Sequence, residues 1–243
     1  MIHQIPLAVG LRDDAAFDNY LPGPNTQARA CVAAAVYGLP SEGSIYLWGG
    51  QGCGKTHLLQ AACSEAGRRG LRSVYIPLGE AGVMTPEVLV GLEQMDLVCI
   101  DDLACVAADP AWEQALFHLY NGLFDQGRQL IVAADRNVGA LELGLDDLAS
   151  RLSWGFVYHL RQLADDDKLT ALQARASARG LMLDREVAMY LLRHYPRDMQ
   201  SLFDALARLD AASLAAQRRL TIPFVRDHLP ASESTSNQTT LFS

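Results

Sequence analysis

Residues 49–56 of the chain read Gly-Gly-Gln-Gly-Cys-Gly-Lys-Thr, and this stretch decides the fold. It lies between an apolar segment at residues 45–48 and a helical pattern that starts at residue 57. The pattern G-x-x-x-x-G-K-[ST] between a strand and a helix is typical of a loop whose backbone N–H groups surround phosphate oxygens. The start of the helix adds positive potential. A chance glycine-rich turn is the alternative.

The loop predicts a nucleotide site in which different residues have different roles. Lys55 is expected to reach the β- and γ-phosphates, and Thr56 to coordinate Mg²⁺. Cys53 is interpreted as a small filling residue, with sensitivity to oxidation as the alternative. The residues that we expect to bind the nucleotide are Gly49, Gly50, Gln51, Gly52, Cys53, Gly54, Lys55, Thr56 and His57.

A second motif follows the apolar segment Leu97–Ile100, which ends in the acidic pair Asp101 and Asp102. Charge at the end of an otherwise apolar strand needs a reason. Asp101 is expected to hold Mg²⁺, directly or through water. Asp102 is expected to orient or deprotonate the attacking water. An ordinary acidic turn after a strand is the alternative.

A third apolar segment, Leu130–Ala133, leads to Asp135. The carboxyl ends of parallel strands face the ligand crevice of such a sheet. Asp135 is therefore predicted to sense the γ-phosphate through the attacking water, and an ordinary turn is again the alternative.

The order of segments predicts an α/β fold with a parallel five-stranded sheet and helices on both faces. Short apolar runs alternate with helical patterns such as Lys55–Ala66 and Ala111–Asp125, as in βαβ units. Apolar runs of this kind are typical of strands covered on both faces. The predicted strands are Ser44–Trp48, Ser73–Pro77, Leu97–Ile100, Leu130–Ala133 and Phe156–Leu160.

Residues 163–229 show only helical patterns and predict a small all-α domain. Acidic residues at 165–167 and a glycine at 180 are typical of the start and end of one helix. Further helices are expected to begin near Asp184, at Pro196 and at Thr221. The predicted divisions are residues 1–12 as a leader, 13–162 as the α/β domain, 163–229 as the helical domain and 230–243 as a disordered tail.

Composition excludes several classes of protein. The chain has 20 basic and 28 acidic residues and a net charge of -8, which argues against a stand-alone DNA-binding protein. Its five cysteines form no C-x-x-C pair, so neither a disulfide framework nor a zinc site is expected. No signal peptide and no apolar run long enough for a membrane span is present, and we expect a cytoplasmic protein.

Further segments carry a resemblance to a known family. They are residues 145–155, LDDLASRLSWG, and residues 195–202, YPRDMQSL, together with FDNY at 17–20 and VCIDDL at 98–103. With the phosphate loop, they resemble the AAA+ ATPase module of the DnaA family of bacterial replication initiators. Over residues 4–229 the chain is similar to the Hda group of that family, the DnaA-related regulatory inactivators. DnaA's own N-terminal domain and C-terminal helix-turn-helix have no counterpart in this sequence.

The resemblance implies roles for two arginines. Arg151 matches the arginine finger, which acts in trans on the nucleotide of a neighbouring molecule. Arg197 matches the arginine by which the helical domain, the lid of AAA+ proteins, contacts bound nucleotide. Asp147 stands where DnaA carries a second arginine, and this departure argues against DnaA-like self-assembly.

The resemblance also implies partners and ligands. Residues Gln4, Ile5, Pro6 and Leu7 are similar to the peptide by which the Hda group binds the sliding clamp, the β subunit of DNA polymerase III. An amide at the pocket edge and apolar side chains inside the pocket give such a peptide its affinity. A second candidate with the same pattern is Gln238, Leu241 and Phe242. An accidental match is the alternative for this tail segment.

Together these features predict a negative regulator of chromosomal replication initiation. With DNA-loaded clamp it would stimulate hydrolysis of ATP on DnaA, touching DNA only indirectly. ADP or ATP with Mg²⁺ is the expected ligand, the resemblance favours ADP, and a homodimer remains open. The alternatives are an autonomous AAA+ ATPase, such as a helicase loader or clamp-loader subunit, and a binding module that only blocks DnaA assembly.

Overall fold

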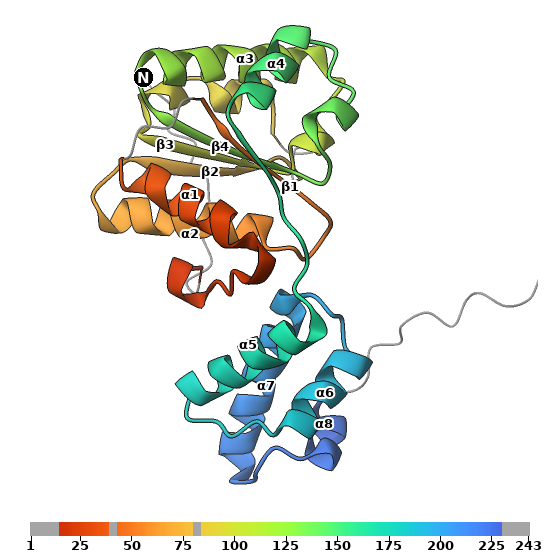
Figure 1. Cartoon of the computed structure of the whole chain (residues 1–243). Coiled ribbons are helices and arrows are strands. Elements are labelled where there is room, and N and C mark those ends of the chain that lie inside the picture. The colour runs from red at the N-terminus through yellow and green to blue at the C-terminus, as the bar shows by residue number, and fades with distance from the viewer. Residues whose placement is uncertain (1–14, 39–42, 80–83, 230–243) are drawn as a thin grey trace, which may run out of the picture. The chain divides into compact units, whose positions relative to one another are not determined.

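The computed structural model of the chain describes residues 15–38, 43–79 and 84–229 (Figure 1). These residues form two compact units whose boundary lies between Gln162 and Leu163. The predicted leader and tail lie outside the described residues.

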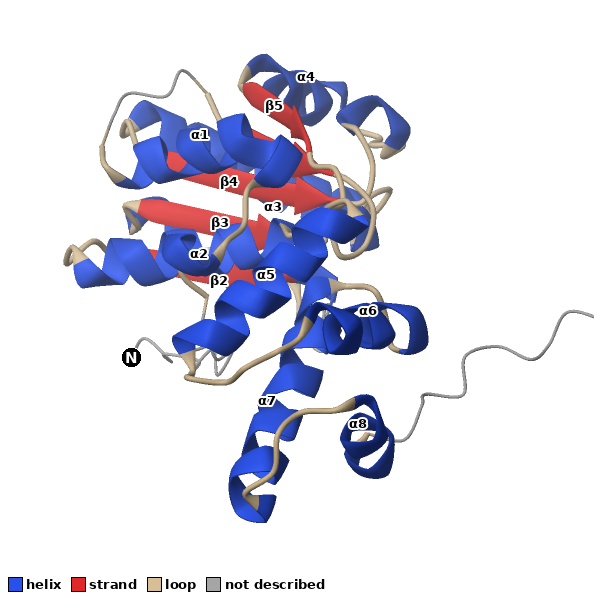
Figure 2. Ribbon diagram, turned by 60° about the horizontal axis from the view of Figure 1, so that its bottom comes forward, coloured by secondary structure: helices blue, strands red, loops and turns tan. Residues whose placement is uncertain are grey.

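A parallel sheet of five strands forms the centre of the first unit (Figure 2). The order across the sheet is β2-β3-β4-β1-β5, and every neighbouring pair is parallel. Each predicted strand is present, and its ends differ from the prediction by at most one residue. The strands are β1 (Ile45–Trp48), β2 (Ser73–Pro77), β3 (Leu97–Asp101), β4 (Gln129–Ala134) and β5 (Phe156–His159).

Helices cover both faces of the sheet (Figure 1). Helices α1 (Thr26–Val36) and α2 (Lys55–Arg68) lie on one face, and α3 (Pro110–Asp125) and α4 (Asp146–Trp154) lie on the other. Successive strand residues point to opposite faces. Ile45 and Leu47 accordingly join the core beneath α1 and α2, whereas Tyr46 joins the core beneath α3 and α4.

Asp109 and Pro110 explain where helix α3 begins. The Asp109 carboxylate accepts hydrogen bonds from the backbone N–H groups of Ala111 and Trp112, and Pro110 occupies the first helical position. The helix therefore starts one residue before the predicted Ala111.

Short 3₁₀ turns occur at Phe17–Asn19, Gly23–Asn25, Pro86–Leu89, Leu92–Gln94, Leu103–Cys105 and Val138–Ala140.

Strand β5 departs from the expectation that every strand is covered on both faces. Phe156 and Val157 are 43% and 42% exposed. Because β5 is the last strand of the sheet and pairs only with β1, the helices of this chain leave its side chains partly uncovered. The apolar character of the strand did not reveal this edge position.

The second unit consists of helices around a leucine-rich core. The helices are α5 (Asp165–Ala178), α6 (Arg185–His194), α7 (Met199–Ala216) and α8 (Ile222–His228). Gly180 follows α5 with a φ of 72°, as expected after a helix end. Helix α7 begins at Met199 and not at Pro196, because the Asp198 side chain accepts a hydrogen bond from the N–H of Ser201 and so caps the helix. The predicted fold class, an α/β unit followed by a small all-α unit, is confirmed.

Among the described residues, no helix is both long enough and apolar enough to cross a membrane.

Candidate functional site

The phosphate loop connects the end of β1 to the start of α2. Two of its glycines have space for no other residue. A Cβ at Gly49 would lie 2.3 Å from the backbone oxygen of Leu160, and one at Gly54 would lie 2.7 Å from the Tyr20 ring. Gly54 also has a φ of 96°, which side chains disfavour. Larger side chains at these two positions would therefore disturb the tight path of the loop between β1 and α2.

Lys55 lies within this loop and is 8% exposed. Its ammonium group donates hydrogen bonds to the backbone oxygens of Gly49 at 2.7 Å and Gly50 at 3.1 Å. The positive charge is therefore held against the first residues of the loop. The binding of phosphate by Lys55 stays a prediction.

Thr56 and Asp101 lie in direct contact, although 45 positions separate them in the chain. The Thr56 hydroxyl donates a 2.6 Å hydrogen bond to Asp101 Oδ2, which also accepts one from the Tyr75 hydroxyl at 3.0 Å. The other oxygen, Oδ1, accepts from the Asp102 backbone N–H at 3.0 Å. Asp101 is only 1% exposed, so these donors compensate a buried carboxylate.

The donors at this point fit a magnesium ion. Mg²⁺ prefers hard oxygen ligands and is usually held by one or two protein groups together with phosphate oxygens and water. The hydroxyl of Thr56 and the carboxylate of Asp101 supply such a pair beside the phosphate loop. Magnesium itself stays a prediction.

Tyr75 is a site residue that the sequence reasoning missed. It lies on β2, beside β3, and burial together with the negative charge of Asp101 raises its pKa well above the ordinary value. The hydroxyl therefore stays protonated and remains a hydrogen-bond donor to Asp101. Its buried position in an apolar strand was visible in the sequence, but its partner was not.

Asp102 and Asp135 follow β3 and β4, which are neighbours in the sheet. Burial raises the pKa of Asp102 above its ordinary value; the charges of Asp101 and Asp135 act in the same direction, and Lys55 opposes them. A carboxylate with a raised pKa is a better proton acceptor, which suits the predicted role toward water.

Asp135 is half-exposed and is already paired. Its two carboxylate oxygens accept hydrogen bonds from Arg136 Nε and Nη2, both at 2.8 Å. Hydrogen bonding by Arg136 lowers the pKa of Asp135. If Asp135 senses the γ-phosphate through a water molecule, as predicted, its carboxylate oxygens would bind that water and Arg136 at the same time.

The segment before α1 packs beside the phosphate loop, where the Tyr20 ring lies next to Gly54. The Asn25 amide accepts from the Arg161 N–H at 2.9 Å and donates to the Arg161 carbonyl at 2.8 Å, which joins this segment to the end of the sheet. The His57 ring contacts the Ala16 carbonyl at 3.0 Å and stands beside Tyr20. No local pattern in the sequence predicts the contact between Asn25 and Arg161, because 136 positions separate them.

Cys53 is 5% exposed within the loop. Burial raises the pKa of its thiol, so it is held in the less reactive protonated form. These features favour the predicted filling role.

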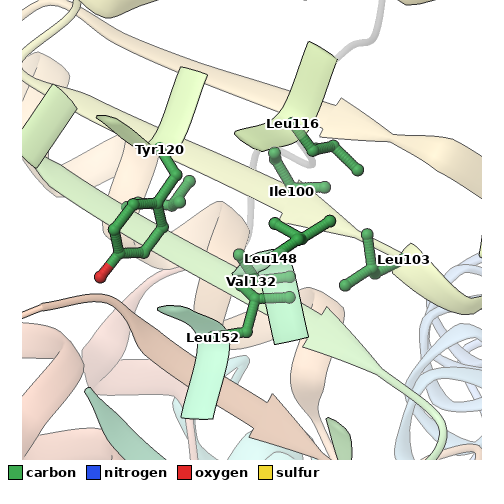
Figure 3. A pocket seen from close by; sticks show the side chains of 8 residues that line it. Ile100, Leu103, Leu116, Tyr120, Val132, Leu148 and Leu152 are labelled. Atoms are coloured by element: carbon green, nitrogen blue, oxygen red, sulfur yellow. The ribbon is translucent and has the colours of Figure 1, made fainter. Parts of the chain in front are cut away.

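Arg151 lies on α4, and its guanidinium carbon is 5.8 Å from the centre of the Tyr120 ring on α3. Figure 3 shows Leu148 and Leu152 of the same helix directed at Val132 and the neighbouring apolar side chains. Among the described residues, no carboxylate pairs with Arg151. Within the described part of the chain, the Arg151 guanidinium therefore lies over Tyr120 of α3, and no contact joins it to a residue of the phosphate loop.

Arg197 belongs to the helical unit and precedes α7. Its Nε donates to the Leu192 carbonyl at 3.2 Å, and its Nη1 lies 3.7 Å from an Asp165 oxygen. The contact of Arg197 with nucleotide stays a prediction. The two predicted clamp-binding segments, at residues 4–7 and 238–242, lie outside the described residues.

Two family models match the chain. The model of the bacterial DnaA ATPase domain matches residues 11–80 and 86–159. The model of the Hda lid domain matches residues 165–229.

Solved structures of similar fold include two DnaA proteins. Domain III of the Thermotoga maritima replication initiation protein DnaA aligns with a TM-score of 0.74 and 23% identity, covering 90% of this chain and 97% of that chain. AMPPCP-bound DnaA from Aquifex aeolicus aligns with a TM-score of 0.70 and 27% identity, covering 81% and 65%. The RuvB Holliday junction branch migration motor of Thermotoga maritima shares the fold at a TM-score of 0.66 and 17% identity, covering 90% and 72%.

Proposed function

Because the chain belongs to the bacterial DnaA ATPase domain family, we propose that it is a nucleotide-bound negative regulator of chromosomal replication initiation in bacteria. It acts with the DNA-loaded sliding clamp and stimulates hydrolysis of the ATP bound to DnaA. The observation that carries this proposal is the combination of a DnaA-type ATPase unit with a second unit that matches the Hda lid model.

Nucleotide binding in this proposal falls to the phosphate loop and its neighbours. Lys55 neutralises phosphate charge, and Thr56 and Asp101 would hold Mg²⁺, which would neutralise further phosphate charge. Arg197 adds a positive charge from the helical unit. The similarity to a DnaA that binds AMPPCP supports an adenine nucleotide, and ADP is the ligand that we favour.

Arg151 is the residue by which the chain acts on its partner. It inserts its guanidinium beside the γ-phosphate of ATP on DnaA and stabilises the charge that develops in the transition state. An arginine supplied in trans raises the hydrolysis rate by about 10³- to 10⁵-fold, which equals roughly 4–7 kcal/mol. Among the described residues no carboxylate pairs with Arg151, so its guanidinium N–H groups would not have to leave an ion pair within the chain before they bind the partner's phosphate.

The clamp concentrates the chain on DNA. Residues Gln4–Leu7 bind a clamp pocket, and the segment around Gln238, Leu241 and Phe242 is the second candidate anchor. Binding to the clamp raises the effective concentration of the chain near DnaA, so a weak direct contact between the two suffices. The net charge of -8 is compatible with this arrangement, because the clamp and DnaA contact the DNA.

Autonomous ATP hydrolysis is a second candidate function. The observation in its favour is Asp102, whose raised pKa suits activation of water beside Asp101. In this case the chain alone, supplied with ATP and Mg²⁺, would turn over at a rate that needs neither DnaA nor clamp.

A reconstituted assay tests the proposal. The hydrolysis of radiolabelled ATP preloaded on DnaA is followed with the chain, ADP and DNA-loaded clamp, and then with each component omitted. The proposal expects rapid hydrolysis only in the complete mixture. Hydrolysis that is equally slow in every mixture would contradict it, and turnover of free ATP by the chain alone would favour the second candidate.

A further inference from the structure

Glu113 is a buried acid in the first turn of α3. It is 2% exposed, and its carboxylate accepts three backbone hydrogen bonds. Oε1 accepts from Ala108 N–H at 2.9 Å and Gly144 N–H at 3.1 Å, and Oε2 accepts from Leu145 N–H at 2.7 Å. A buried carboxylate is tolerated when hydrogen bonds of this kind compensate it.

Two of these three donors belong to the segment that leads into α4. Leu145 occupies the N-cap position of that helix, and its own side chain cannot provide a capping bond. Glu113 therefore fixes the entry of α4 from outside, across 32 positions of sequence.

Apolar packing does not fill this end of the contact between α3 and α4. A cavity of about 450 Å³ lies there, lined in part by Ala108, Phe117, Gly144 and Leu145. Farther along α4, Leu148 and Leu152 are 1% and 2% exposed in the apolar cluster that Figure 3 shows. Leu148 in the first turn and Leu152 near the end thus pack α4 against the core, and the bonds of Glu113 fix the backbone that enters the helix.

Arg151 stands on α4 six residues after Leu145, which corresponds to about 9 Å along a helix. Because a helix is stiff over this length, a shift at its first residue moves the guanidinium. A reacting group that is misplaced by about 1 Å can lower a rate by about 100-fold.

We propose that Glu113 is a positioning residue, which sets the place of Arg151 by fixing the start of α4 to α3. The inference rests on the proposed function of Arg151 and adds the residue that aims it. Glu113 does not touch the partner's nucleotide.

The test compares four variants in the DnaA hydrolysis assay. Glu113→Met removes the acceptor oxygens at similar length, and Glu113→Gln keeps one of them. Val32→Ala is the matched control, since it opens a cavity in α1 on the opposite face of the sheet. Arg151→Ala removes the finger itself. Each variant is also characterised by its thermal unfolding and its affinity for ADP.

We expect Glu113→Met to lower the maximal hydrolysis rate at least about tenfold. The chain concentration for half-maximal rate and the affinity for ADP should stay within about threefold, because only an interaction made in the transition state is lost. Glu113→Gln keeps one acceptor oxygen but turns an NH₂ group toward a backbone donor, so it should recover part of the rate. Val32→Ala should keep the maximal rate despite a lower unfolding temperature.

The variants separate the positioning role of Glu113 from the proposed role of Arg151. Full stimulation by Arg151→Ala would overturn both. If Arg151→Ala abolishes stimulation while Glu113→Met keeps the full maximal rate, the positioning role alone is wrong. A loss of rate that follows the unfolding temperature equally in the Glu113 and Val32 variants would also overturn it. If Glu113→Met does not fold, Glu113→Asp, which withdraws the carboxylate by one methylene, is judged by the same criteria.

Discussion

The hydroxyl of Thr56 donates a 2.6 Å hydrogen bond to the carboxylate of Asp101 and so joins the start of α2 to the end of β3. Because a backbone N–H and the Tyr75 hydroxyl also bind this carboxylate, its oxygens are fixed before any ligand arrives. Preorganised oxygens of this kind are what a magnesium ion on a bound nucleotide requires.

Removal of this contact should weaken magnesium binding. We expect Thr56→Val to lower the apparent Mg²⁺ affinity of the nucleotide complex by about 10- to 100-fold, the range for altered metal surroundings. Calorimetric titration with ADP at several Mg²⁺ concentrations measures this, and titration in EDTA gives the metal-free affinity. An unchanged dependence on Mg²⁺ would contradict the metal assignment. Thr170→Val, which alters an exposed threonine in the helical unit, is the control.

Arg197 should affect the affinity of the chain for its own nucleotide. Loss of one hydrogen bond from a charged group costs about 1.5–3 kcal/mol, so Arg197→Ala should weaken ADP binding by roughly 10- to 100-fold. Arg185→Ala is a matched control, since Arg185 is an exposed arginine of the same unit that pairs with Asp166 at 2.8 Å. If both substitutions leave the ADP affinity unchanged, the lid assignment is wrong.

Asp102 should make the stability of the chain depend on pH. Burial raises its pKa in the folded state, so the folded chain holds this proton more strongly than the unfolded chain does. The favourable contribution is therefore present below the ordinary carboxyl pKa of about 3.9 and is lost as pH rises through the raised value.

The substitution Asp102→Asn removes this titration. The free energy of unfolding of this variant minus that of the unmodified chain should increase as pH rises from acid to neutral, because only the unmodified chain loses stability through Asp102. Urea unfolding at a series of pH values measures the difference. A difference that stays constant, or falls with pH, would show that Asp102 is not held in this environment.

The leader should be the main anchor on the clamp. Gln4→Ala with Leu7→Ala should weaken clamp binding at least about 30-fold, as expected for loss of two anchoring side chains. Deletion of residues 237–243 should have a smaller effect that is clearest in the leader variant. Surface plasmon resonance on immobilised clamp measures both.

Two results would contradict these expectations. If deletion of the tail alone abolishes binding, the order of the two anchors is reversed. If it changes neither the affinity of the unmodified chain nor the residual binding of the leader variant, the tail is not an anchor.

Local sequence patterns predicted the parts of this molecule that depend on neighbours in the chain. The phosphate loop, the five strands and the capped helices each have a signal within about ten residues. Asp101 was identifiable because a charge ends an apolar strand.

Contacts between distant segments were not predictable in this way. The sequence shows that Tyr75 lies between apolar residues and that Glu113 lies near the start of a helix. It does not show that Tyr75 binds Asp101 or that Glu113 binds Leu145, each more than 20 positions away. A charged residue in the first turn of a helix is usually exposed to solvent, whereas Glu113 is buried. The edge position of β5 likewise depends on the order of strands, which the pattern of any one strand does not contain.

The role of Arg151 is tested most directly by a single rate, the hydrolysis of ATP bound to DnaA in the presence of ADP, DNA-loaded clamp and the Arg151→Ala variant. Arg69→Ala is the matched control, because Arg69 also lies over a tyrosine ring, at 4.2 Å from the centre of Tyr37. We expect a rate about 10³-fold or more below that of the unmodified chain for Arg151→Ala, an unchanged rate for Arg69→Ala and unchanged ADP affinity for both. Full stimulation by Arg151→Ala would contradict the central claim that this arginine acts on the nucleotide of DnaA.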